Sequence, residues 1–354
     1  MGNLSGVGAS PMIALAAMNS NRLTLCMAAL LLLLSGCATA FHPPHPRPGE
    51  PIITNGVFHL RDGTQLPYRV WRPQGPMNAP MNAPVKALVL ALHGFDDSRD
   101  GWAIPAAALS KAGIEVIAPD QPGFGATADR GQWAGTAAYL DDARQMIAQL
   151  QQRHPGTKLT VMGESMGGAE ILLLAGSANP PPGVTFIASA PAVWGGAALN
   201  PLFRASLAVG NALAPAYRLT GKQAAVRASD NIAALIAFSR DPLTIRATRI
   251  GTIAGLVRMM GDALQACATL RAPTFILYGG KDQLIPKGAM AACWRSIPPD
   301  APVILGYYPP DYHMIPRDLE RATPLSDIIS YILHPGQGLP SAAPINATIF
   351  LATH

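Results

Sequence analysis

The sequence predicts an α/β fold: a mostly parallel central sheet flanked by helices, with a helical insertion. Two observations predict it. Short, continuous apolar runs, typical of strands buried on both faces, alternate with stretches of helical pattern. This alternation stops at about residue 192 and resumes at about residue 271, and the stretch between is rich in Ala, Leu, Ile and Met at helical spacing. Alternating strands and helices favour parallel pairing with right-handed crossovers.

The first 56 residues are expected to precede the fold. An apolar run, Leu23 to Leu34, follows Arg22 and has the length of a secretory signal peptide, so residues 1–36 are interpreted as one, with Met1 or Met18 as its start. The run ends in Leu34-Ser-Gly-Cys37, which resembles a bacterial lipobox. That resemblance implies lipidation of Cys37 and an exported lipoprotein, anchored to a membrane at the periplasmic or outer-membrane face. An ordinary secretory signal is the alternative.

Residues 37–56 are rich in proline and are predicted to form an extended tether. Beyond it, only Cys267 and Cys293 remain of the four cysteines, and a disulfide or two buried thiols fit equally well. The formal net charge of +5 is not clustered into basic runs, which argues against nucleic acid as a partner.

The core is expected in two parts, residues 57–191 and 271–333, separated by a helical cap at 192–270. Asp62-Gly63 indicates a hairpin turn between the first two strands. Residues 334–354 are interpreted as a C-terminal tail. The expected strands are 57–60, 66–71, 87–92, 114–118, 159–162, 184–188, 274–278 and 302–307, and the expected helices are 106–112, 137–153, 231–238, 244–260 and 324–333.

A candidate nucleophile lies in Gly163-Glu-Ser-Met-Gly167, directly after the strand at 159–162. A strand, a sharp turn and a helix in this order are typical of a nucleophile elbow, with Ser165 at its tip. Glycine is needed at both flanks because a Cβ there would collide with the backbone where the turn closes. The alternative is a plain glycine-rich turn, since the chain contains 34 glycines.

Two other strand ends supply partners for this serine. Asp282 follows the strand at 274–278, and His313 follows the last strand. Ligand-binding residues of open α/β sheets gather at the carboxyl ends of the strands, so we expect the three side chains to meet. The chain order Ser165, Asp282, His313 is that of the α/β-hydrolases. The alternative for Asp282 is a turn residue that caps the next helix.

A His-Gly turn, His93-Gly94-Phe95, follows the strand at 87–92 and resembles the oxyanion loop of α/β-hydrolases. The resemblance implies that the backbone N–H groups of Phe95 and Met166 hold the negative charge that develops during acyl transfer. It also implies that His93 shapes the loop and is not the catalytic base.

From about residue 57 to 333 the chain resembles the α/β-hydrolases of the monoacylglycerol lipase and lysophospholipase group, also called serine aminopeptidase S33-like hydrolases. One departure is Ala126-Thr127, which stands where a serine often follows Gly-x-Gly in this group. The matching marks are His93-Gly94-Phe95, Pro119-Asp-Gln-Pro-Gly-Phe-Gly125, Gly163-Glu-Ser-Met-Gly167, Gly280-Lys-Asp282, and His313 with Arg317-Asp318.

The resemblance implies hydrolysis of carboxylic esters of single-chain lipids by a Ser-His-Asp triad through an acyl-enzyme, without metal or organic cofactor. The expected partners are a small amphiphilic ester and, through the lipid anchor, a membrane. The alternatives are a short-chain carboxylesterase or an S33-like peptidase on the same scaffold, and a non-catalytic binding lipoprotein. The sequence does not predict the oligomeric state.

Overall fold

The computed structural model describes residues 50–74, 84–220 and 226–354. The expected signal peptide, Cys37 and most of the expected tether lie outside these residues. Within them, every helix is too short or too polar to cross a membrane.

The central sheet has eight strands. Across the sheet they follow the order β1 (Ile52–His59), β2 (Gln65–Arg72), β4 (Ile114–Pro119), β3 (Ala87–Leu92), β5 (Lys158–Glu164), β6 (Val184–Ser189), β9 (Thr274–Gly279) and β10 (Val303–Tyr308). β1 and β2 pair antiparallel at one edge, and the six strands from β4 to β10 pair in parallel. β3, β4 and β9 are buried along their whole length because helices cover both faces. The predicted α/β fold is therefore confirmed.

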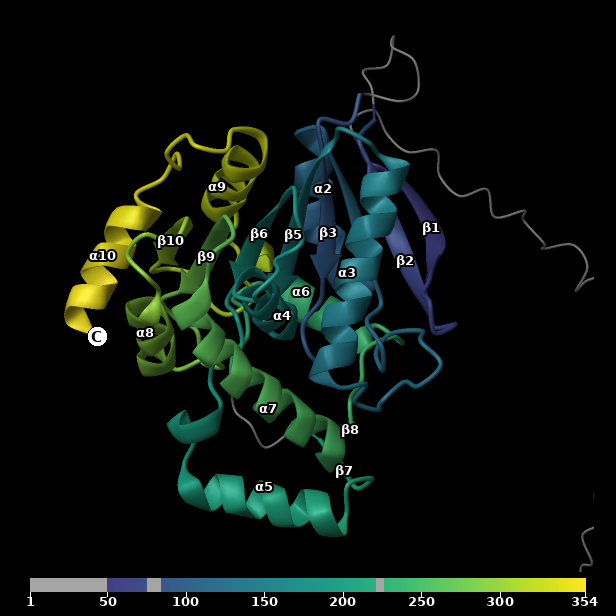
Figure 1. Ribbon diagram of the computed structural model, residues 1–354, viewed down its shortest axis with the longest axis vertical. Helices are drawn as coiled ribbons and strands as arrows, with labels where there is room; N and C mark the ends of the chain where they lie inside the picture. Colours follow the sequence, from purple (N-terminus) through teal and green to yellow (C-terminus); the bar gives the residue numbers. More distant parts are fainter. Residues whose placement is uncertain (1–49, 75–83, 221–225) are drawn as a thin grey trace, which may run out of the picture. The chain divides into compact units, whose positions relative to one another are not determined.

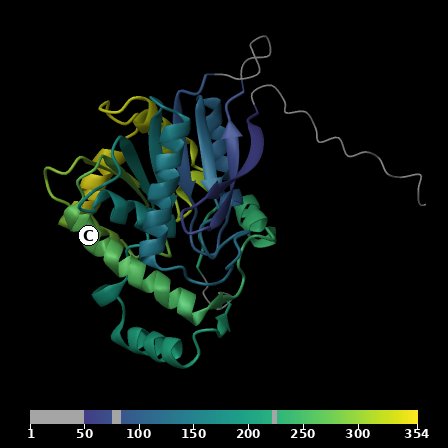
Figure 2. The same cartoon turned by 45° about the vertical axis from the view of Figure 1, so that its right-hand side comes forward.

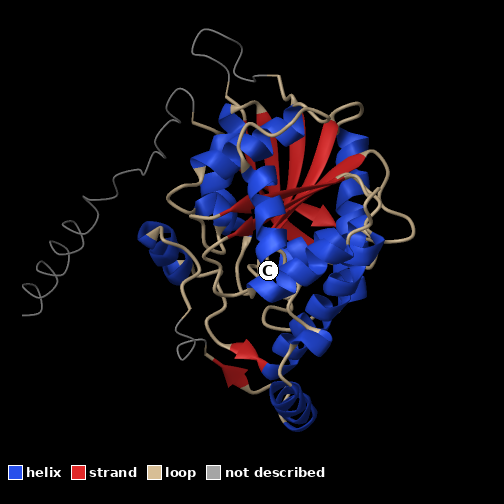
Figure 3. Ribbon diagram, turned by 90° about the vertical axis from the view of Figure 1, so that its left-hand side faces the viewer, coloured by secondary structure: helices blue, strands red, loops and turns tan. Residues whose placement is uncertain are grey.

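Two groups of helices enclose the sheet (Figures 1 and 3). α2 (Ala103–Lys111) and α9 (Ala322–Leu333) pack on one face. The other face carries α3 (Thr136–Arg153), α4 (Met166–Ala175), α7 (Ile250–Ala266), α8 (Lys287–Ser296) and α10 (Ala343–Thr353). Because strand side chains alternate in direction, β3 sends its leucines to the larger group and its alanines and valine to the smaller one.

The insertion between β6 and β9 contains α5 (Pro201–Leu213), α6 (Ile232–Arg240) and a two-stranded ribbon of β7 (Arg218–Leu219) and β8 (Thr248–Arg249). α5 has no buried side chain and contacts α7, which lies between α5 and the sheet (Figure 2). α7 itself packs on α4 and provides the crossover that joins the parallel strands β6 and β9. The expected cap at 192–270 thus includes a helix of the core. This helix begins at Ile250 and not at the expected residue 244, because Thr248 and Arg249 pair with β7.

Two segments predicted to lie outside the core belong to it. β1 begins at Ile52, inside the expected tether, because it pairs with β2 along its whole length. The expected tail contains α10, whose Ala347 and Phe350 side chains are buried, and Phe350 stacks on Tyr307 of β10 at a ring-centroid distance of 4.7 Å.

Cys267, directly after α7, and Cys293 of α8 form a disulfide, and their Cα atoms are 5.4 Å apart. The sequence left open whether these cysteines form a disulfide or remain two buried thiols, and the structure contains the disulfide. The bond joins the crossover helix to the helix that precedes β10.

Candidate active site

Ser165 lies at a sharp turn between β5 and α4, as the elbow motif predicts. Its backbone has φ 56° and ψ −110°, a conformation that residues other than glycine rarely adopt. The turn closes only because its flanks are glycines. A Cβ on Gly163 would lie 2.2 Å from the carbonyl of Gly167, and a Cβ on Gly167 would lie 2.3 Å from the carbonyl oxygen of Leu92.

The loop after β10 brings His313 to Asp282. The imidazole Nδ1–H donates to Asp282 Oδ2 at 2.8 Å, and both side chains are buried. The approach depends on Gly279, since a Cβ there would lie 2.1 Å from the carbonyl oxygen of Tyr312. The other carboxylate oxygen of Asp282 accepts the backbone N–H groups of Leu284 and Ile285, so the aspartate also holds the turn before α8.

Opposing effects act on the pKa of His313. Burial lowers it, but the charge and hydrogen bond of Asp282 outweigh burial, and the net result is a raised pKa. Glu164 adds to the increase and Arg317 opposes it. The Asp282 carboxylate therefore favours the imidazolium that forms when this histidine accepts a proton.

His313 and Ser165 line the same cavity, which has a volume of about 680 Å³. Nε2 of His313 is buried and has no hydrogen-bond partner among the described residues. That nitrogen is the atom through which a triad histidine serves a nucleophile and a leaving group. Apart from the polar groups near Ser165, the cavity wall is mainly apolar and includes Trp194, Phe203, Phe238, Leu256, Met260 and Ile285.

The loop from His93 to Asp97 passes directly over the serine. A Cβ on Gly94 would lie 3.3 Å from the Cβ of Ser165, and Phe95 lines the cavity beside it. Met166 is the first residue of α4, so its N–H is among those that a helix leaves without an internal partner. Phe95 and Met166 thus flank Ser165 from two different elements.

His93 is occupied within its own loop. Its Nδ1 lies 2.8 Å from the carbonyl oxygen of Gly94, and its Nε2 accepts the backbone N–H of Gln121 at 3.0 Å. Burial lowers the pKa of His93, which keeps the ring neutral. Both ring nitrogens are used, which agrees with the expected role of shaping the loop.

Sequence reasoning missed a buried charge network beneath the site. Nη2 of Arg317 donates to Asp97 Oδ2 at 2.6 Å and to Glu164 Oε1 at 2.8 Å. All three side chains are about 95% buried. Burial raises the pKa of Glu164, and the charge of Arg317 offsets part of that increase. Glu164 lies inside the elbow motif and Arg317 is one of the matching marks, but no sequence signal paired the three side chains.

The cap is bonded to the same loops. The backbone N–H of Ile245 donates to the carbonyl oxygen of Asp96, and the Thr248 hydroxyl donates to the Asp96 carboxylate at 2.5 Å. Burial raises the pKa of Asp96 to about 6. Ser229 of the cap donates to Asp318, which also accepts the N–H of Tyr312 beside His313. The position of the cap is therefore coupled to the loop over Ser165 and to the loop that carries His313.

Among the described residues, no group of three or more His, Cys, Asp or Glu side chains is arranged to hold a metal ion. Ser165 and the hydrogen-bonded pair of His313 and Asp282 are suited to nucleophilic attack and proton transfer by side chains.

A model of the family described as serine aminopeptidase, S33, matches residues 83–320. The chain is 27% identical over 275 residues to a monoacylglycerol lipase of Mycolicibacterium smegmatis, covering 77% of this chain and 94% of the relative. It is 26% identical over 266 residues to the human monoglyceride lipase, covering 74% of this chain and 84% of the relative.

Solved structures share the fold. A soluble variant of monoglyceride lipase from Saccharomyces cerevisiae, in complex with a substrate analogue, superposes with a TM-score of 0.65 at 19% identity, covering 82% of this chain and 97% of that one. The monoacylglycerol lipase of Paleococcus ferrophilus superposes with a TM-score of 0.60 at 19% identity, covering 76% and 98%. The sheet and its flanking helices are thus those of the α/β-hydrolases.

Proposed function

The chain belongs to the serine aminopeptidase S33 family of α/β-hydrolases, and from that premise we propose that it cleaves carboxylic esters of single-chain lipids, such as monoacylglycerols or lysophospholipids. One observation carries the proposal. Ser165 and an Asp282-bound His313, with a free Nε2, open into a single, mainly apolar cavity of about 680 Å³.

In the proposed reaction, Ser165 Oγ attacks the ester carbonyl while His313 Nε2 takes its proton. The carbonyl oxygen becomes an oxyanion held by the N–H groups of Phe95 and Met166. The imidazolium then gives its proton to the leaving alcohol, which leaves an acyl group on Ser165. Water attacks this acyl-enzyme by the same route, releases the acid and restores the serine.

The cavity supports an acyl chain as the bound group. Its volume lies within the usual range for small-molecule sites, about 300–1,000 Å³, and its aromatic and aliphatic wall matches a hydrocarbon. Two of the relatives that the chain matches, which are named as lipases of monoacylglycerols or monoglycerides, point to the same class.

A peptidase acting on free N-termini is less well supported. It needs an unpaired carboxylate in the site to hold the substrate ammonium. The cavity wall contains two carboxylates, Asp97 and Glu164, and both are paired with Arg317.

The test is hydrolysis of a panel of p-nitrophenyl esters and monoacylglycerols of increasing chain length. We expect activity to rise from short to long acyl chains and to vanish in Ser165→Ala, which remains folded. Ser189→Ala removes a buried hydroxyl from the neighbouring strand end and is expected to stay active. Activity near the wild-type level in Ser165→Ala would rule out the mechanism, and a maximum at acetyl esters would make the protein a short-chain esterase.

We also propose that Cys37 carries a lipid anchor that keeps the enzyme at a membrane. The lipobox-like Leu34-Ser-Gly-Cys37 supports this, and so does the disulfide in the core, because disulfides persist in exported proteins. Metabolic labelling with a palmitate analogue is expected to mark the wild-type protein and a Cys26→Ser control. Equal labelling of Cys37→Ser would exclude Cys37 as the attachment site.

A further inference from the structure

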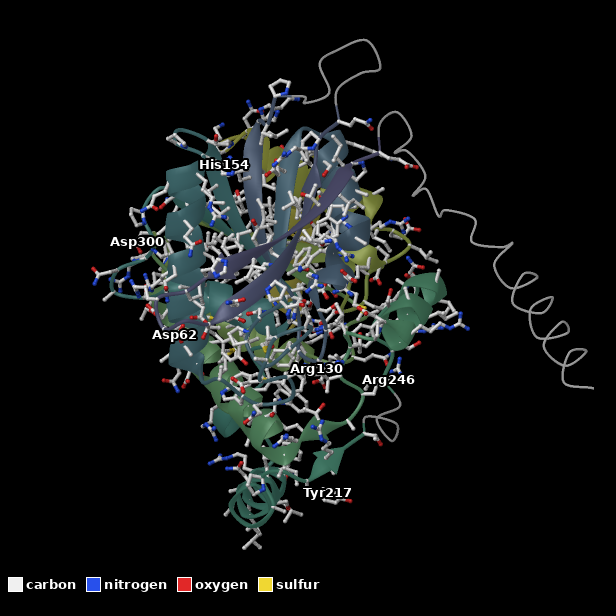
Figure 4. The ribbon with its side chains drawn as sticks, turned by 90° about the vertical axis from the view of Figure 1, so that its right-hand side faces the viewer. Asp62, Arg130, His154, Tyr217, Arg246 and Asp300 are labelled. Atoms are coloured by element: carbon white, nitrogen blue, oxygen red, sulfur yellow. A yellow bond between two sulfur atoms is a disulfide. The ribbon has the colours of Figure 1, made fainter. Side chains whose placement is uncertain are left out.

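A second cavity lies at the junction of the cap and the core, and its wall is basic. It has a volume of about 410 Å³ and shares no residue with the cavity at Ser165. Three arginines line it, Arg130 from the core and Arg218 and Arg246 from the cap, and no acidic residue does. Figure 4 shows Arg130 and Arg246 close together at this junction.

Two of these guanidinium groups are held in place by neutral partners. Arg130 donates from Nη2 to the carbonyl oxygens of Pro242 and Thr244, at 2.8 and 3.0 Å. Arg218 donates from Nη1 to the carbonyl oxygen of Ala247 at 2.9 Å. A Cβ on Gly131 would lie 3.5 Å from both terminal nitrogens of Arg218, so this group lies against the loop that carries Arg130. The carbonyls orient the forks but leave their charges uncompensated.

A fourth arginine adds to the unbalanced charge. Arg249 of β8 is the register partner of Arg218 in β7, and like charges directly opposite each other destabilise a strand pair. Its Nε is buried and without a hydrogen-bond partner in the described part of the chain. Within residues 50–74, 84–220 and 226–354, none of the four arginines forms an ion pair with a carboxylate.

We propose that this cavity binds a phosphate group, either of a soluble phosphate compound or of a lipid headgroup. Guanidinium forks match phosphate oxygens two at a time, and several of them around one cavity suit a ligand with several oxygens and more than one negative charge. Bound phosphate would also relieve the repulsion between Arg218 and Arg249. This proposal does not rest on the reaction proposed at Ser165, because the two cavities share no residue. Its test measures binding and not turnover.

Calorimetric titration of the full-length protein with inorganic phosphate, at constant ionic strength, tests the site. Arg246 makes no hydrogen bond in the described structure, so Arg246→Gln removes its charge without loosening the cap. We expect Arg246→Gln and Arg218→Gln each to weaken phosphate binding about tenfold, the loss of one charge-assisted pair. The matched control is Arg204→Gln, which removes an exposed cap arginine outside the cavity and should bind as the wild type does.

Co-sedimentation with vesicles distinguishes the two sources. Vesicles of phosphatidylcholine with phosphatidylglycerol are compared with vesicles of phosphatidylcholine alone. Selective loss of phosphatidylglycerol binding in Arg218→Gln and Arg246→Gln identifies a headgroup. Binding of inorganic phosphate that depends on these arginines, without such a loss, identifies a soluble compound. If neither ligand distinguishes these two variants from Arg204→Gln, the proposal is wrong.

Discussion

Nη2 of Arg317 lies 2.8 Å from Oε1 of Glu164, the residue directly before Ser165. The same nitrogen lies 2.6 Å from Asp97, two residues beyond Phe95. Arg317 itself follows His313 by four residues. One buried guanidinium therefore joins the elbow, the loop over the serine and the histidine loop, which approach each other from distant parts of the sequence.

We expect Arg317→Met to destabilise the fold by about 3–5 kcal/mol, because it leaves two carboxylates buried without a positive partner. Turnover should fall as well, since the three loops lose their common contact. Urea unfolding and the rate of ester hydrolysis measure the two effects. Arg258→Met, at an exposed position on α7, is the control and should change stability by less than about 0.5 kcal/mol. Equal stability of the two variants would show that the network contributes nothing.

The pH dependence of kcat/KM is expected to reflect His313. The histidine must be neutral to take the proton of Ser165, so the rate rises as pH increases through its pKa. Asp282 raises that pKa above the ordinary histidine value of 6.5, which places the acidic limb above pH 6.5. In Asp282→Asn the lowering effect of burial dominates and the limb moves to lower pH.

The same substitution also removes the group that fixes the histidine tautomer, and the plateau should fall by about 10⁴-fold, as in other serine hydrolases. The exposed Asp62→Asn is the control for changes in surface charge. An acidic limb unchanged in Asp282→Asn would mean that another group controls it.

Two glycine substitutions compare a position without space for a Cβ with a position where a Cβ meets no other atom. Gly163→Ala places a Cβ 2.2 Å from the Gly167 carbonyl, so the elbow cannot close and we expect loss of folded protein or of activity. At Gly288, in the first turn of α8, a Cβ meets no atom within 4 Å. Gly288→Ala is therefore expected to stabilise the fold by up to about 1 kcal/mol. Folded yield and urea midpoints measure both, and a tolerated Gly163→Ala would contradict the account of the elbow.

Local patterns were sufficient to predict the parallel strands of the sheet and to nominate the three residues of the proposed triad, but they captured only the end of β1, which begins at Ile52. β3 is a continuous apolar run, and Ser165, Asp282 and His313 each follow a strand of the sheet or a turn directly after it. In a parallel sheet the strand ends share an edge, so residues far apart in sequence could be expected to meet. The glycine spacing at the elbow has a purely local steric reason, so the elbow could also be recognised from the sequence.

Contacts that depend on tertiary packing could not be predicted. Arg317 is 220 residues from Asp97 and 153 from Glu164, and no local rule pairs charges over such separations. The disulfide was undecided for the same reason. α7 was assigned wholly to the cap because a helical pattern does not reveal whether it packs on the sheet or above it.

The sequence did not predict α10, and the reason is local. Alanine occupies two of its buried positions, Ala343 and Ala347, while Ile345 and Ile349 are exposed, so the large apolar residues do not mark one face and the segment was interpreted as a tail. What fixes the helix is Phe350, which is 1% exposed and stacks on Tyr307. We expect Phe350→Ala to cost about 3–5 kcal/mol of unfolding free energy, since it leaves a cavity among aromatic rings. Ile349→Ala, at a neighbouring position that is 58% exposed, should cost less than about 1 kcal/mol. Equal urea midpoints for the two variants would mean that α10 is not part of the cooperative core.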